Sequence, residues 1–190
     1  MNEAVGAVTV FITIVIYGFY IRDTLRGTIK PHPFSWLLWL IIMFVIFLAQ
    51  VSDGAGPGAW MNGVVTIMNF IIFVISLKGS ALIIKKFDVF ILVLACVAIT
   101  LWILTSNPFL SVIILSVANT LAYIPTYRKS FAKPFEEPLY IYGINFFRHA
   151  LAIVALANYS IVTALSPAIL VLNNFSIFLF LYYRRRVVAS

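Results

Sequence analysis

The sequence has few of the residue types on which soluble enzymes and metal proteins depend. Only 10% of its 190 residues are charged, and it contains six Asp and Glu, two His and a single cysteine, Cys96. One cysteine permits no disulfide within the chain, and no Cys, His or carboxylate group has the spacing of a metal site. We therefore expect no metal and no cofactor. Cys96 lies within an apolar run and is interpreted as a small core residue.

Catalytic groups are missing from the apolar segments as well. An intramembrane enzyme needs a nucleophile beside a base, or grouped metal ligands, and the sequence offers neither pattern. We therefore expect a protein that is not an enzyme. The 13 Lys and Arg give a net charge of +7, which in a soluble protein would suggest nucleic-acid binding, but their positions have a different explanation.

Long hydrophobic runs dominate the sequence. Hydrophobic residues make up 63% of the chain, whereas soluble domains average about 45–50%, and the mean hydropathy is +1.08. A membrane-spanning helix needs about 20 apolar residues, and an open strand cannot satisfy its backbone in lipid. The sequence therefore predicts an all-α integral membrane protein with seven transmembrane helices. The runs lie at about 4–21, 34–51, 59–77, 88–105, 108–126, 139–158 and 165–183.

The basic residues lie on one predicted side of the membrane. Twelve of the 13 follow the first, third, fifth and seventh runs, and the thirteenth is Arg148, inside the sixth. Basic loops stay in the cytoplasm and contact anionic lipid headgroups. This distribution predicts an outside N-terminus and a cytoplasmic C-terminus. It also removes the reason to expect a nucleic-acid partner. The compact chain and the lack of a signal-peptide pattern favour the bacterial inner membrane.

The chain carries a weak internal repeat. A shift of 103 residues aligns residues 20–21 with 123–124, and a shift of 105 aligns 69–73 with 174–178, where four of five residues are identical. The two halves are then three helices each, joined by one linker helix that restores the chain direction and makes the repeats parallel. We predict a first repeat over 1–79, a linker helix over 80–106, and a second repeat with a basic tail over 107–190.

This 3+1+3 layout resembles the SWEET sugar transporters and the wider PQ-loop (MtN3-like) group. Pro125-Thr126, followed by a basic stretch, is similar to the end of the first helix of a family repeat, and Asn69 and Asn174 are similar to its symmetry-related, substrate-facing asparagines. The resemblance implies transport of a small polar solute by alternating access between two three-helix bundles. It also implies two alternatives, which are a neutral sugar uniporter and a receptor or sorting protein that binds without transport.

Polar residues at mid-membrane depth are the candidate binding residues. A polar side chain at this depth is costly and typically functional, and a site shared by two repeats lies near the midplane. Each asparagine could instead only tie two helices together through a hydrogen bond. The candidate substrate-binding residues are Asn69, Asn119, Asn145, Arg148, Asn173 and Asn174.

Arg148 is the most informative of these residues. It cannot lose its proton, and none of the six acidic residues lies at its depth. Its partners are therefore carbonyls, asparagines, water or an anionic ligand, because a guanidinium binds carboxylate or phosphate through paired hydrogen bonds. His149 lies about 100° around the helix from Arg148, so we expect the two side chains not to point straight into the same cavity. His149 is either a proton relay or a hydrogen-bonded structural residue.

Pro125 is the one proline deep inside a predicted span. It removes a backbone hydrogen bond, and the resulting kink is either a hinge for gating or static. We interpret the protein as a transporter of a small polar, anionic metabolite, with spans one and five as gates. The number of copies that associate is left open, so a homo-oligomer remains an alternative to a monomer.

Overall fold

The described part of the chain is entirely helical in its regular structure. The computed structural model describes residues 2–27, 31–78, 84, 86–132, 134–135 and 139–189. The predicted all-α class is confirmed within these residues. Their helices are α1 (Asn2–Leu25), α2 (Pro33–Ser52), α3 (Pro57–Ser76), α4 (Lys86–Thr105), α5 (Phe109–Leu121), α6 (Tyr123–Ala132), α7 (Leu139–Val154) and α8 (Ile161–Ala189).

Six segments are long and apolar enough to cross a membrane, as the prediction of a membrane protein requires. They are α1, α2, α3, α4, α8 and the combined segment Phe109–Ala132 formed by α5 and α6. Proline occupies the first position of α2 and of α3, where its missing N–H has no helical partner to lose. The predicted sixth run, 139–158, is wrong at its end. Helix α7 stops at Val154 after 16 residues.

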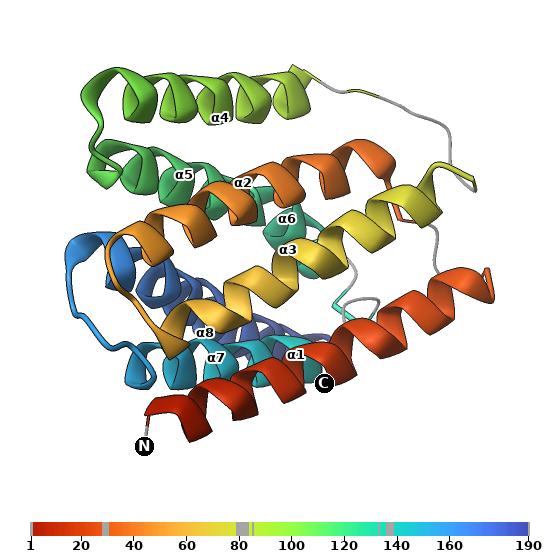
Figure 1. Cartoon of the computed structure of the whole chain (residues 1–190). Helices are drawn as coiled ribbons and strands as arrows, with labels where there is room; N and C mark the ends of the chain where they lie inside the picture. The colour runs from red at the N-terminus through yellow and green to blue at the C-terminus, as the bar shows by residue number, and fades with distance from the viewer. Residues whose placement is uncertain are drawn as a thin grey trace.

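Both halves of the chain pack in the same order. In the first half, α3 packs extensively against both α1 and α2; in the second half, α8 packs against α7 and also against α5 and α6. Helix α4 contacts α5 and α2 and lies at the edge of the bundle (Figure 1). We refer below to α1–α3 as the first half and to α5–α8 as the second half. The predicted boundary between the first repeat and the linker lies among residues outside the described part.

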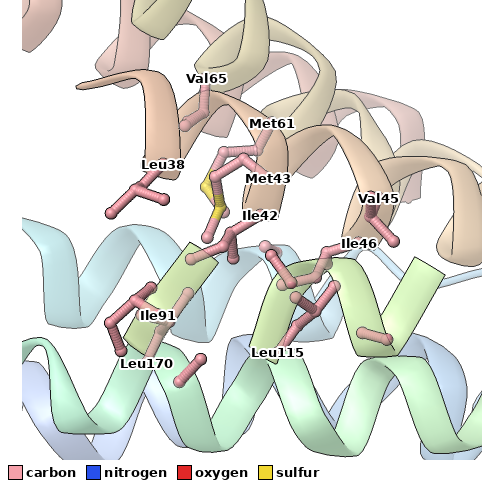
Figure 2. Close-up of a cluster of buried hydrophobic side chains, with 14 of the residues drawn as sticks. Leu38, Ile42, Met43, Val45, Ile46, Met61, Val65, Ile91, Leu115 and Leu170 are labelled. Carbon is pink, nitrogen blue, oxygen red and sulfur yellow. The ribbon is translucent and has the colours of Figure 1, made fainter. Parts of the chain in front are cut away.

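Helix α2 holds the two halves together through an apolar core. Ile42 and Ile46 are fully buried and belong to one cluster with Leu115 of α5, Ile91 of α4 and Leu170 of α8 (Figure 2). Burying such a side chain contributes about 1.5–3 kcal/mol relative to an exposed one, a value that applies where water is the alternative. Since lipid surrounds a membrane bundle, close packing rather than water exclusion is the main source of stability here.

One face of α4 is left uncovered. Cys96, expected in the core, is exposed on this helix, because α4 buries only the side that faces α5 and α2. The core interpretation of Cys96 is therefore wrong. Three of the predicted cytoplasmic basic residues, Lys30, Lys85 and Lys133, lie outside the described residues.

Candidate functional site

A cavity of about 110 Å³, lined by several polar side chains, lies between the two halves. Its size is below the roughly 300 Å³ at which pockets for drug-sized ligands begin, so it suits a small solute. The first half contributes Tyr17, Trp39, Met43, Asn62, Val65 and Asn69. The second half contributes Asn119, Tyr123, Asn145, Arg148, His149, Leu170 and Asn174.

The cavity brings together most of the candidate residues predicted from the sequence. Six line it, namely Asn69, Asn119, Asn145, Arg148, His149 and Asn174. Asn173 does not line the cavity. It directly precedes Asn174 on α8, so its side chain points in a different direction, and its Nδ2 donates to Thr120 Oγ1 at 3.1 Å. The side chain of Pro125 lies outside the described part. Its backbone is the third residue of α6, just beyond the break at Ala122 that separates α5 from α6.

Two adjacent turns of α7 position its polar side chains. Asn145, Arg148 and His149 all line the cavity. At about 100° per residue, Asn145 lies between the other two when α7 is viewed along its axis. Arg148 and His149 were expected not to point straight into the same cavity. Both line it from either side of Asn145, because the cavity covers an arc of α7 about as wide as the angle between them.

Arg148 is buried without an opposite charge. Its side chain is 4% exposed, and among the described residues no acidic side chain forms an ion pair with it. Its Nη1 donates to Thr13 Oγ1 of α1 at 3.1 Å, and the Thr13 hydroxyl in turn donates to the Thr9 carbonyl at 2.7 Å. The Tyr17 ring centre lies 6.0 Å from Arg148 Cζ. These contacts orient the guanidinium but leave its charge uncompensated within the described residues.

Several buried polar atoms on the cavity wall have no hydrogen-bond partner among the described residues. They include both amide atoms of Asn69, Asn174 Oδ1, Arg148 Nε and His149 Nδ1. Asn174 Nδ2, in contrast, donates to Tyr123 Oη at 3.0 Å and to the Leu170 carbonyl at 2.7 Å. Most buried polar groups in native proteins are paired with protein atoms or water. A wall with this many unpaired donors and acceptors is suited to binding a polar solute.

Seven cavity residues were not predicted as binding residues from the sequence, and among them Asn62, Tyr17 and Tyr123 carry amide or hydroxyl groups. Asn62 lies seven residues before Asn69 on α3, and two helical turns place both on one face, so this spacing could have identified it. Tyr17 and Tyr123 lack such a signal, because a tyrosine in a membrane helix is more typical of an interfacial anchor. Their role depends on how each helix is rotated, which tertiary packing decides.

No protein-family model, curated protein or solved structure matches this chain.

Hydrogen bonds join the two halves at one end of the bundle, and we refer to them as the seal. The α2–α3 and α7–α8 connections meet at the end of the bundle that carries the N-terminus (Figure 1). Ala157 N donates to the Ala55 carbonyl at 2.9 Å, and Asn158 Nδ2 donates to the Asp53 carbonyl at 2.8 Å. The Ser160 hydroxyl also donates to the Asp53 carboxylate. These bonds seal the end of the bundle that the distribution of basic residues predicts to be outside.

Glycine allows the closest approach at this seal. Gly56 has a φ of +58°, and a Cβ built there would lie 2.7 Å from Ala157 Cβ. A Cβ on Gly58 would lie 2.9 Å from Leu156 Cα. Larger residues at either position would hold the α2–α3 and α7–α8 connections apart.

A polar chain links the seal to the cavity. Asn62 Nδ2 donates to Gln50 Oε1, and Gln50 Nε2 donates to the Thr163 carbonyl, each at 2.8 Å. Thr163 Oγ1 lies at the start of α8 and donates to the Asn158 carbonyl at 2.7 Å. The closed end therefore contains a path of hydrogen-bonding groups rather than an apolar plug.

Proposed function

We propose that this membrane protein transports a small polar, anionic metabolite by alternating access between its two halves. The observation that carries the proposal is the small cavity between them, whose wall holds an uncompensated arginine and several unpaired buried amide and imidazole atoms. Such a wall has a high energy unless a polar partner occupies it. A bound anion would supply the missing charge and would accept hydrogen bonds from Arg148 Nε and Asn69 Nδ2.

The packing supports two repeated units. In each half the helix last in sequence packs against all the others, which is what two copies of one three-span fold would give when α5 and α6 count as one span. We propose that α4 is the linker of a SWEET-like 3+1+3 arrangement, with the N-terminus outside and the C-terminus in the cytoplasm. A bacterial inner membrane location belongs to the same proposal.

The seal between the α2–α3 and α7–α8 connections supports a gated cavity. Its hydrogen bonds join one half to the other, so rotating the halves apart would break them as a group. Alternating access requires such a seal to form and break during each cycle.

The proposal is tested by uptake into liposomes containing the purified full-length protein. We expect saturable uptake of a labelled small carboxylate or phosphate, and strongly reduced uptake in Asn69→Leu. Uptake of a neutral sugar instead would favour the sugar uniporter, and tight binding without uptake of any solute would favour a receptor or sorting protein. Either result would overturn the proposal.

A further inference from the structure

The 105-residue shift aligns three pairs of residues across the two walls of the cavity. Asn69 pairs with Asn174. The same shift pairs Val65 with Leu170 on α3 and α8, and it pairs Met43 with Arg148 on α2 and α7. All six residues line the cavity. The shift that relates the sequences therefore also relates the two sides of the site.

Charge distinguishes only one of these three pairs. Two pairs are matched in character, as amide with amide and branched aliphatic with branched aliphatic. Met43 is buried and apolar, whereas its counterpart Arg148 is buried and charged. On the first-half wall, Trp39 lies one turn before Met43 and adds an aromatic surface. The cavity therefore has an apolar side on α2 and a cationic side on α7.

The free edge of Arg148 has the geometry that binds a carboxylate. Its Nη1 is used by Thr13, while Nε, on the opposite edge beside Nη2, is buried without a partner among the described residues. Nε and Nη2 together form the fork that holds both oxygens of a carboxylate. The unpaired Nδ2 of Asn69 is a further donor, on the first-half wall of the cavity.

We propose that the cavity selects a small amphipathic monoanion, of the class of short monocarboxylates. Its carboxylate binds Arg148, and its apolar part packs against Met43 and Trp39. A single uncompensated cation balances one negative charge, whereas a dianion would leave a second charge buried and unpaired. This inference rests on the binding cavity of the proposed function and names its substrate class and its specificity-determining pair.

The test exchanges the charge between the two walls. Thermal unfolding of the purified full-length protein is measured with butyrate, its neutral isostere butyramide, the dianion succinate, and inorganic phosphate. A ligand that binds only the folded state raises the melting temperature. We expect a rise with butyrate alone, and we expect Arg148→Met to abolish it. The double variant Met43→Arg/Arg148→Met should restore it, because the guanidinium then enters from the opposite wall.

Two further variants keep the test decisive. Arg128→Met makes the same chemical change at an exposed position and should leave the butyrate response intact. Arg148→Lys retains the charge without the fork and should weaken butyrate binding by about tenfold, the order expected for losing one charged hydrogen bond. It remains informative if Arg148→Met does not fold.

The outcomes separate this inference from the transport proposal. Stabilisation by butyramide, succinate or phosphate equal to that by butyrate would overturn the monoanion assignment. So would a charge-exchange variant that folds but whose melting temperature does not rise with butyrate. Butyrate binding without uptake into liposomes would leave the site assignment standing and remove transport. Uptake of another solute, with no thermal response to monocarboxylates, would support transport and remove the monocarboxylate assignment.

Discussion

Two asparagines on α3 show how differently one residue type can act within a single helix. Asn62 and Asn69 both line the cavity, but Asn62 donates to Gln50 at 2.8 Å, whereas neither amide atom of Asn69 has a partner among the described residues. A buried amide without partners adds no stability, since its desolvation is not offset. The two residues therefore form a matched pair for separating binding from stability.

We predict that Asn69→Leu is neutral or stabilising but strongly reduces solute uptake. Asn62→Leu should instead lower stability by about 1–3 kcal/mol, because it leaves Gln50 Oε1 buried and unpaired. Melting temperatures in detergent and uptake into liposomes measure the two effects. A loss of stability in Asn69→Leu as large as that in Asn62→Leu would identify Asn69 as structural.

Depth in the membrane was the part of the site that sequence could predict. Counting residues into each apolar run identified Asn69, Arg148 and Asn174, because position along a span fixes depth. The direction in which a side chain points was harder to predict from the sequence. Asn173 and Asn174 share one depth, but packing of α8 turned only Asn174 into the cavity. Rotation of a helix about its axis depends on contacts with its neighbours, which a single sequence does not specify.

At the scale of elements, the turn between α2 and α3 controls the seal. Gly56 combines a positive φ with a position where a Cβ would lie 2.7 Å from Ala157 Cβ. We predict that Gly56→Ala weakens the seal and exposes the cavity at that end. In a Cys96→Ser background, labelling of Val65→Cys by an impermeant maleimide should be faster when Gly56→Ala is added.

Gly18→Ala is the control for this prediction. Gly18 lies in the middle of α1, and nothing lies within 4 Å of a Cβ built there. Alanine should favour the helix at that position by up to about 1 kcal/mol and leave the labelling rate unchanged. Unchanged labelling in Gly56→Ala as well would mean that the seal tolerates the added methyl group and does not gate the cavity.

The break between α5 and α6 was partly foreseeable. Pro125 lacks the N–H that would bond to the Leu121 carbonyl, and α5 ends at Leu121. The proline predicted an interruption in this span, and the helix assignment contains one at Ala122. Whether the interruption bends during transport depends on a second conformation, so the hinge stays a prediction.

For the whole molecule, the sequence predicted the number of helical segments better than their lengths. Apolar composition alone defined the runs, because lipid requires each one to be helical. The predicted end of α7 was wrong, since residues 155–158 were counted as part of the span but bond to the α2–α3 connection instead. Ala157 and Asn158 make these bonds. A tertiary contact of this kind has no signature in local composition.

The short helix α7 makes the overall topology testable. Its 16 residues extend only about 24 Å at about 1.5 Å per residue, less than the roughly 30 Å of a hydrocarbon core. If α7 crosses the membrane, three segments separate Lys78 from Tyr159, and the two exposed residues lie on opposite sides. If α7 does not cross, only two segments separate them and both lie on the same side.

We predict that α7 crosses, because Arg148 then reaches the middle of the bundle and local bilayer thinning offsets the missing length at a fraction of a kcal/mol per Å. Single cysteines at Lys78 and Tyr159 in Cys96→Ser, labelled in intact cells with an impermeant maleimide, measure this. Tyr159→Cys should react at once, and Lys78→Cys only after permeabilisation. Reaction of both from one side would mean that α7 does not cross, and it would remove the parallel arrangement of the two halves on which a shared central site depends.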